Sequence, residues 1–333
     1  MKTGECDCTR TAKDRLLPGL FYARHLCGRV SAEGRWNGFT ISRVDWKTMR
    51  LRVMTKVDIP AGMRLKETAG WNQTSADWQR FLDSSPEGCF VAEIDEQVRG
   101  TVTTISFENR FAWIGMVLVD PDHRGQGLGT RLLEKAIEHL DDLKIPALKL
   151  DATPQGRPLY EKLHFLPEYE IGRWTRRRSP SEAANESASS SCESISPELL
   201  KAICRADRDI FGADRGFLLK SVDADAPDFT TGLLHSGRLE GYAFGRRGSF
   251  ADHLGPWMAT EASTARQLLE RFLAHSSREV QVVDCLNSRS FAGDLLKSFG
   301  FSYTRPLVRM FRGSNDFPGR PDLLCSILGP EFG

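Results

Sequence analysis

The sequence predicts an α/β (α+β) chain made of two domains of similar build. Its 333 residues are too many for one ordinary domain and enough for two. Strand-like and helix-like patterns alternate over residues 49–175, and the same order of elements returns over residues 197–333. Between them, residues 176–196 are rich in Ser, Ala and Glu and hold almost no large apolar side chain, which is typical of a flexible linker.

Residues 1–48 are expected to form an extension outside the fold. They are rich in Arg and Gly and show no clear periodicity. The apolar run at residues 16–21 is too short and too broken for a secretory signal. Met49, followed by the alternating Leu51 and Val53, marks the expected beginning of the first strand.

Caps, breakers and hydrophobic periodicity define the elements of the first domain. Asp58 and Pro60 mark the beginning of a helix. Residues 111–119 are almost continuously apolar, as expected for a strand buried on both faces. The expected strands are Leu51–Thr55, Phe90–Ile94, Val98–Ser106, Phe111–Val119, Ala147–Asp151 and Glu168–Arg173. The expected helices are Ile59–Ala69, Ser75–Ser84, Leu128–Leu140, with its single apolar stripe, and Arg157–Leu163.

The second domain repeats this order, with helices first and a strand meander after them. The expected helices are Leu199–Ile210, Arg215–Val222, Ala262–His275 and Phe291–Phe299. The expected strands are Thr231–His235, Leu239–Arg246, His253–Met258 and Glu279–Cys285. The remaining tail, residues 315–333, is rich in Pro and Gly, and we expect it to pack on the surface of this domain.

Composition excludes several classes of partner. Lys and Arg together number 45 against 44 Asp and Glu, so we expect no nucleic-acid partner. No stretch approaches the roughly 20 apolar residues of a membrane span, so we expect no membrane partner. The eight cysteines are scattered and show no C-x-x-C pair, so we expect no metal site and a cytoplasmic location.

A glycine-rich loop joins the strand ending at Val119 to the helix beginning at Leu128. Such a loop aims backbone N–H groups at one point beside the positive end of a helix dipole, which suits a phosphate or pyrophosphate. A Walker loop would need a Lys after Gly129, and a dinucleotide loop needs a different glycine spacing. The loop reads Arg124-Gly125-Gln126-Gly127-Leu128-Gly129-Thr130.

This run, with a strand before it and a helix after it, resembles the coenzyme A pyrophosphate loop of the GNAT superfamily of N-acetyltransferases. A second stretch, Leu159-Tyr160-Glu161-Lys162-Leu163-His164-Phe165, resembles the closing motif of that superfamily. In this motif the tyrosine, here Tyr160, protonates the departing thiolate. The sequence departs from the pattern at His164, where glycine is usual, and at Thr153, where asparagine is frequent.

The resemblance implies two tandem folds, each a mixed central sheet flanked by helices, with acetyl-CoA as the acyl donor. The sheet would splay between the strands ending at Val119 and Asp151, and a backbone N–H near Val117 would polarise the thioester. The amine would attack directly. The implied cofactor-binding residues are Val117, Leu118, Val119, Arg124, Gly125, Gln126, Gly127, Leu128, Gly129 and Thr130.

The general base and the acceptor pocket are less sharply indicated. Candidates for the base are Asp151, at the end of a buried strand, Glu108, Glu67 and His123. Trp71 and Asn72 lie between the first two helices, in the region that covers the acceptor site in the superfamily, and are the expected acceptor-binding residues.

The second domain resembles a degenerate copy of the first. It has no Arg-x-x-Gly-x-Gly run, Glu261 would repel a pyrophosphate, and Leu296 takes the place of Tyr160. We therefore expect catalysis in residues 49–175, with a small-molecule amine as acceptor and a homodimer left open. The alternatives are an acyl-CoA-binding sensor without turnover and, more distantly, a Rossmann-type oxidoreductase.

Overall fold

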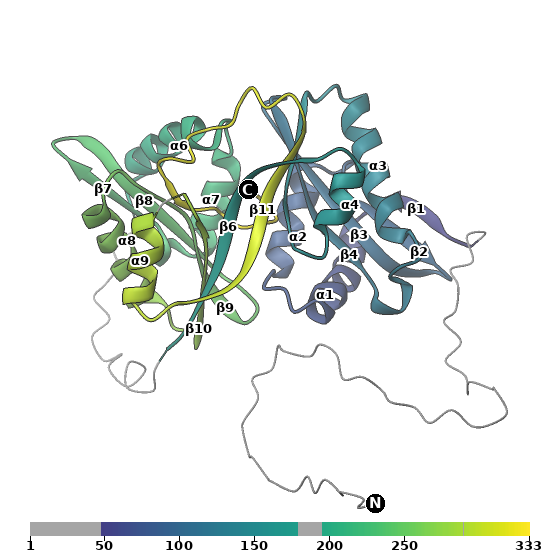
Figure 1. The fold of residues 1–333 in the computed structure, drawn as a ribbon, viewed down its shortest axis with the longest axis horizontal. Helices are drawn as coiled ribbons and strands as arrows, with labels where there is room; N and C mark the ends of the chain where they lie inside the picture. The colour runs from purple at the N-terminus through teal and green to yellow at the C-terminus, as the bar shows by residue number, and fades with distance from the viewer. Residues whose placement is uncertain (1–47, 179–194, 289) are drawn as a thin grey trace, which may run out of the picture. The chain divides into compact units, whose positions relative to one another are not determined.

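The computed structural model describes residues 48–178, 195–288 and 290–333. The expected extension and linker therefore fall almost entirely outside the described residues. In the first repeat the strands are β1 (Arg50–Val53), β2 (Phe90–Ile94), β3 (Gln97–Phe107), β4 (Phe111–Val119), β5 (Ala147–Ala152) and β6 (Leu166–Arg177). Its helices are α1 (Ile59–Thr68), α2 (Ser75–Ser84), α3 (Leu128–Asp142) and α4 (Arg157–Lys162) (Figure 1). Short 3₁₀ turns lie at Lys56–Asp58 and Pro121–His123.

The second repeat follows the first along the chain. Its helices are α6 (Pro197–Phe211), α7 (Gly216–Asp225), α8 (Ala262–His275) and α9 (Ser290–Ser298), with a 3₁₀ turn at Pro227–Phe229. Its strands are β7 (Thr231–His235), β8 (Arg238–Arg247), β9 (Ala251–Ala259), β10 (Val280–Leu286), β11 (Ser302–Gly313) and β12 (Leu324–Ser326). From α1 to β6 the first repeat has the same order of helices and strands as the second has from α6 to β11, and β1 and β12 are the additional strands of the described chain. The α/β class and the duplicated order predicted from the sequence are confirmed.

The strands form one continuous mixed sheet, in which the two repeats exchange a strand. Among the described residues the order is β1-β2-β3-β4-β5-β11-β6-β10-β12-β9-β8-β7. Strand β11 lies between β5 and β6, and β6 in turn lies between β11 and β10 (Figure 1). The sheet of each repeat is thus completed by a strand that belongs, in sequence, to the other.

Strands β4 and β5 begin as parallel neighbours and then diverge. They pair only at Ala112–Leu148 and Trp113–Lys149. Further along, β4 bulges at Met116, whose φ is +50°, and the register with β3 shifts there. The Thr101 hydroxyl donates a 2.8 Å hydrogen bond to the Met116 carbonyl and holds the bulge in place. The splay that the resemblance implied is therefore present.

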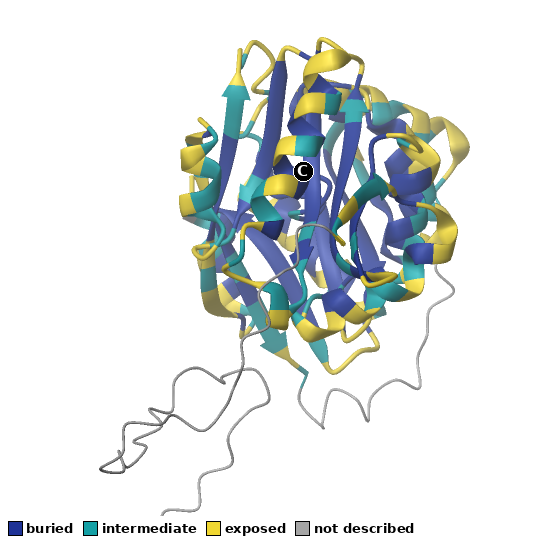
Figure 2. Cartoon of the chain, turned by 90° about the vertical axis from the view of Figure 1, so that its right-hand side faces the viewer, coloured by how far each residue is buried: buried dark blue, intermediate teal, exposed yellow. Residues whose placement is uncertain are grey.

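Apolar faces of the helices cover both sides of the sheet. Most of its strand residues are buried, whereas the helices turn their exposed residues outward (Figure 2). Helix α3 buries the whole apolar stripe predicted from its spacing, which is Leu128, Leu132, Leu133, Ala136, Ile137 and Leu140. On another part of the core, Trp78 and Phe81 of α2 are fully buried. None of the helices in the described ranges is long and apolar enough to cross a membrane.

The tail corrects one expectation. Residues 315–323 are exposed or half-buried, as expected, but residues 324–333 are almost all buried, because β12 inserts beside β9 and β10. Leu328 and Phe332 are fully buried, and the Phe332 ring stacks on Phe81 with ring centroids 4.7 Å apart. The Pro and Gly content of the tail favours a surface segment, whereas the apolar run at residues 323–328 has the composition of a buried strand.

Candidate active site

The glycine-rich loop is shaped by two left-handed glycines. The Asp120 carboxylate accepts a 3.2 Å hydrogen bond from the Asp122 N–H and turns the chain after β4. Gly125 and Gly127 then have φ of +72° and +87°, and Gly127 is the N-cap of α3. Side chains with a Cβ rarely adopt these angles, so glycine is required for this path. A Cβ built at Gly125 would meet open space, so the loop is accessible from outside.

The N-terminus of α3 offers backbone donors beside this loop. Its first internal hydrogen bond runs from the Arg131 N–H to the Gly127 carbonyl at 3.1 Å. The N–H groups that precede Arg131 in the helix therefore point out of its end, at the positive pole of the dipole. The Arg124 Nε donates to the Val119 carbonyl at 3.0 Å, which fixes the loop against the end of β4. This arrangement fits a pyrophosphate.

A cleft opens where β4 and β5 diverge. Its empty space, counted together with the adjoining open solvent, is about 490 Å³. One end is lined by residues of β4, β5, α4 and the β5–α4 loop, which are Ile114, Gly115, Met116, Val117, Leu150, Asp151, Thr153 and Tyr160. The other end is lined by residues of the α1–α2 loop, β6, β11 and the tail, which are Trp71, Gln73, Arg173, Arg305, Leu307, Pro330 and Glu331. We call these the donor end and the acceptor end.

Tyr160 is the α4 residue that lines the cleft. It follows β5 on α4, and its ring meets Phe165 edge-on with centroids 6.1 Å apart. Burial raises the pKa of Tyr160 to about 12, so the phenol keeps its proton at neutral pH. Nearby, Thr153 uses its hydroxyl to accept a hydrogen bond from the Gly156 N–H at 3.2 Å, which begins the turn into α4.

Asp151 also lines the cleft, but its carboxylate is engaged. Arg309 of β11 donates to both carboxylate oxygens at 2.9 Å, and it donates a third hydrogen bond to the Tyr169 hydroxyl at 2.6 Å. Burial raises the pKa of Asp151, while the Arg309 guanidinium opposes the rise. The geometry is that of a buried bidentate ion pair.

Glu108 lies away from the cleft. It occupies the turn between β3 and β4 and accepts hydrogen bonds from Arg208 at 2.8–3.1 Å and from the Asp214 N–H at 2.9 Å. Hydrogen bonds from Arg208 hold the pKa of Glu108 below its usual value. The structure does not bring it together with Tyr160, and the other two candidates, Glu67 and His123, are not among the lining residues either.

The two expected acceptor residues have different surroundings. Trp71 lines the acceptor end of the cleft. The neighbouring Asn72 faces the β8–β9 loop instead. Its amide nitrogen donates to the Ala251 carbonyl at 3.0 Å, and its amide oxygen accepts from the Phe250 and Ala251 N–H groups at 3.1 and 3.0 Å. Asn72 therefore ties the α1–α2 loop to the second repeat.

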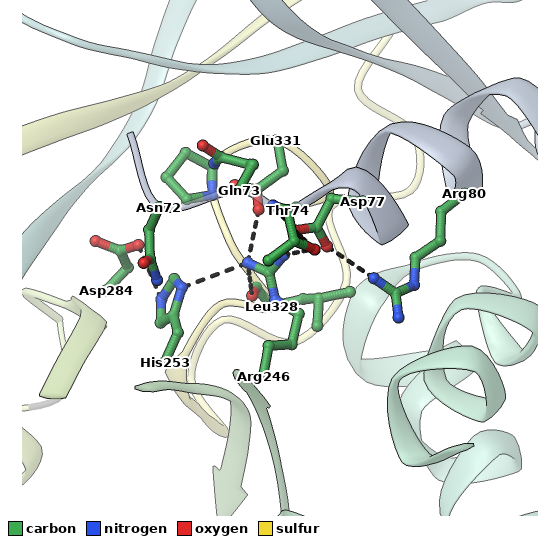
Figure 3. A network of polar contacts seen from close by, with 12 residues as sticks. Asn72, Gln73, Thr74, Asp77, Arg80, Arg246, His253, Asp284, Leu328 and Glu331 are labelled. Atoms are coloured by element: carbon green, nitrogen blue, oxygen red, sulfur yellow. Dashed lines mark hydrogen bonds and ion pairs between the residues drawn. The ribbon is translucent and has the colours of Figure 1, made fainter. Parts of the chain in front are cut away.

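A buried charge network supports the acceptor end (Figure 3). Arg246 reaches Asp77 at 2.9 Å and Glu331 at 2.6 Å. It also lies 3.4 Å from the Nδ1 of His253, whose Nε2 is 3.2 Å from Asp284. Burial disfavours the charged form of Asp284, but Arg173 and His253 outweigh this and hold its pKa well below the usual range. The network joins both repeats beneath the cleft.

Several lining residues were missed by the sequence reasoning. Arg305, Leu307 and Glu331 lie beyond residue 300, and strand exchange and the inserted tail bring them to the first repeat. Gly115 makes room for the tail, because a Cβ there would lie 2.7 Å from the Glu331 carbonyl oxygen. In the sequence, the pattern that could have indicated this part of the cleft was Glu331, an acidic residue inside an apolar tail. In the described part of the chain, no group of three or more His, Cys, Asp or Glu side chains is placed to hold a metal ion.

A splayed mixed sheet beside a glycine-rich helix N-terminus defines the class of acyltransferases that the sequence resembles. Residues 62–165 match the model of the Acetyltransferase (GNAT) family, and residues 203–325 match that of an Acetyltransferase (GNAT) domain. The chain therefore belongs to the GNAT acetyltransferase family and carries two GNAT domains in tandem.

Relatives and solved structures span most of the chain. A holothin acyltransferase of Pseudoalteromonas sp. (strain SANK 73390) is 26% identical over 271 residues, covering 79% of this chain and 87% of its own. The uncharacterized N-acetyltransferase YitH of Bacillus subtilis is 25% identical over 239 residues, covering 72% and 83%. The crystal structure of a putative acetyltransferase from Pyrococcus horikoshii has a TM-score of 0.71 at 22% identity, covering 86% and 97%. The last likeness concerns the fold alone.

Proposed function

We propose that the first repeat transfers an acetyl group from acetyl-CoA to a primary amine of a small molecule. The observation that carries the proposal is a single cleft that holds Tyr160 and the β4 bulge and opens where β4 leaves β5, beside the strand end that leads to the glycine-rich loop. A donor bound along this path would place its thioester at the bulge and its thiol beside Tyr160.

Each part of the donor end has a distinct task in this proposal. The N–H groups at the α3 N-terminus hold the pyrophosphate. In the described chain the pairing of β4 with β5 ends at Trp113, so the edge of β4 at Val117 and Val119 is open for the pantetheine arm to join as an extra strand. An N–H of the bulge near Val117 stabilises the negative charge that develops on the carbonyl oxygen.

Proton transfer completes the reaction. The amine nitrogen forms a bond to the acetyl carbon, the carbon–sulfur bond breaks, and Tyr160 gives its proton to the departing thiolate. The nitrogen, positively charged after the attack, releases a proton to solvent, and Tyr160 regains one from solvent. The amine has to be neutral before it attacks. Asp151 and Glu108 are not assigned as its base, because Arg309 engages the first and Arg208 the second.

The second repeat is proposed to be without catalysis. At the position of the phosphate loop, Glu261 is the N-cap of α8 and places a negative charge where a pyrophosphate would bind. Leu296, at the position of Tyr160, is fully buried in the apolar core. The contribution of this repeat is to supply β11 and the tail to the cleft.

The donor site is tested by Gly127→Glu. The new carboxylate would repel the pyrophosphate, so acetyl-CoA binding measured by calorimetry should be lost. Gly237→Glu is the matched control, because Gly237 also has a positive φ, of +77°, and a Cβ there meets nothing within 4 Å. Equal acetyl-CoA affinity in both variants would contradict the assignment of the loop.

Turnover is tested by Tyr160→Phe. Loss of the phenolic proton should lower the rate of thiol release from acetyl-CoA with a panel of amines by about 10²–10⁴-fold, the usual contribution of a general acid, and leave acetyl-CoA binding unchanged. Tyr303→Phe is the control, because Tyr303 is 48% exposed and is not among the cleft-lining residues. Tight acetyl-CoA binding without thiol release for any amine would instead indicate an acyl-CoA-binding sensor.

A further inference from the structure

The charges at and beside the acceptor end are almost all paired. Asp151 is bonded to Arg309, Arg173 to Asp284 at 2.8 Å, and Glu331 to Arg246 at 2.6 Å. The first two pairs each join one acid to one guanidinium, whereas Glu331 shares the Arg246 guanidinium with Asp77. The remaining charged lining residue is Arg305.

Arg305 is a partly buried cation that forms no ion pair in the described chain, and the Asp284 carboxylate only partly offsets the charge of Arg173 there. Among the residues that the structure describes, no carboxylate lies within ion-pair distance of its guanidinium. It lies on β11 opposite Arg173, just past an irregularity in the pairing with β6. Burial and the neighbouring charge of Arg173 lower the pKa of Arg305 to about 10. An anion at this point of the cleft would relieve both effects.

A buried hydrogen-bond acceptor faces the same space. Gln73 lines the cleft and is 8% exposed. Its amide oxygen is buried and has no hydrogen-bond partner in the described chain. A buried oxygen without a donor is costly, so it calls for an N–H group from a ligand. Trp71 and Leu307 add apolar surface between these polar groups.

We propose that the acceptor is a small amine that also carries a carboxylate, as in a free amino acid, with the carboxylate bound by Arg305 and an amine N–H directed to Gln73. The inference rests on the proposed function and names the acceptor class for it. The reaction joins the amine nitrogen to the acetyl carbon and releases the thiol. The carboxylate takes no part in the bond changes, and its role is to position the amine.

The test compares amines that share a side chain and differ only in the group on the carbon next to the nitrogen, which is a carboxylate, an amide or hydrogen. One series is L-leucine, L-leucinamide and isoamylamine, and a second is L-phenylalanine, L-phenylalaninamide and phenethylamine. Thiol release from acetyl-CoA gives kcat/KM for each compound with the wild-type protein, Arg305→Gln and Arg312→Gln. Arg312 is the matched control, since it lies on the same strand, pairs with the exposed Asp141 and does not line the cleft.

We expect Arg305→Gln to lower kcat/KM for the carboxylates by about 10–100-fold, the range for a lost hydrogen bond to a charged group. The amides and plain amines should change little. The ratio of kcat/KM for the carboxylate to kcat/KM for the amide is compared between variants, because this comparison cancels the difference in basicity between the two amines. Arg312→Gln should keep the wild-type ratio. An unchanged ratio in Arg305→Gln would overturn the proposal.

A second readout does not depend on turnover. Phenylglyoxal attacks a deprotonated guanidine, so the low pKa of Arg305 should make it the fast-reacting arginine, identified by peptide mass spectrometry. In the presence of coenzyme A, the amino acids should slow this labelling and the amides should not. Equal labelling of Arg305 in the presence of the amino acids and of the amides would overturn the inference.

If acetyl-CoA binds and only uncharged amines are acetylated, the acceptor class fails while the proposed function stands. If acetyl-CoA does not bind, the proposed function itself fails.

Discussion

Replacing Asp151 with Asn should destabilise the fold much more than it slows the chemistry. The side chain of Asp151 is 0% exposed and that of Arg309 is 5% exposed. The two residues face each other in the register of β5 and β11. Asn removes the negative charge and leaves the Arg309 guanidinium buried beside neutral groups, the Asn amide and the Tyr169 hydroxyl. Breaking a buried pair in this way costs about 3–5 kcal/mol of unfolding free energy.

The expected loss is large enough to measure by thermal unfolding. In domains of 150–250 residues, each kcal/mol shifts Tm by about 2–4 °C, so Asp151→Asn should lower Tm by about 6–20 °C. The double variant Asp151→Leu/Arg309→Met replaces both charges by apolar groups and should lose much less, because no unpaired charge remains. Tm and kcat/KM would be measured for both variants and the wild type.

The opposite pattern would refute this reasoning. If Asp151→Asn kept the wild-type Tm but lost more than about 100-fold in kcat/KM, the carboxylate would be acting as the general base. The pH profile separates the two roles further, since loss of a base removes the corresponding ionisation from the kcat/KM curve, whereas loss of a structural pair leaves it in place.

Two other predictions follow from packing and charge. Gly115→Ala should push the tail away at Glu331 and cost about 1–3 kcal/mol by overpacking; a wild-type urea midpoint would contradict it. Asp58 is buried, which disfavours its charge, but hydrogen bonds from Arg52 outweigh this and hold its pKa below the usual value. Wild-type stability should therefore fall between about pH 6 and pH 3 as Asp58 is protonated, more steeply than in Arg52→Met. The free energy of unfolding in urea would be measured for both proteins at both pH values. An equal loss in the wild type and in Arg52→Met would exclude this linkage.

Local elements were predictable because their determinants lie within a few residues. The stripe on α3, the loop around Gly127 and the placement of Tyr160 on a short helix after β5 all follow from short-range spacing. Element ends shifted by a few residues, as in β6, which runs from Leu166 to Arg177. Nothing in these local patterns depended on the rest of the chain.

The acceptor end was not predictable in the same way. Its wall depends on β11 pairing with β5 across about half of the chain, and no local pattern specifies such a partner. Asn72 and Glu108 illustrate the same limit, since their residue types suit a polar site. Tertiary contacts direct the first to the β8–β9 loop and the second to Arg208.

The exchanged strands also bear on the order in which the protein can fold during synthesis. A ribosome that has completed the first repeat through Arg177 has not yet made the strand that fills the space between β5 and β6. Asp151 meets its guanidinium only when residues 302–313 have emerged. Domains usually fold one after another as they are made, but here the first repeat has to wait for the second. Until then, the exposed edges of β5 and β6 are unpaired templates for any nearby strand.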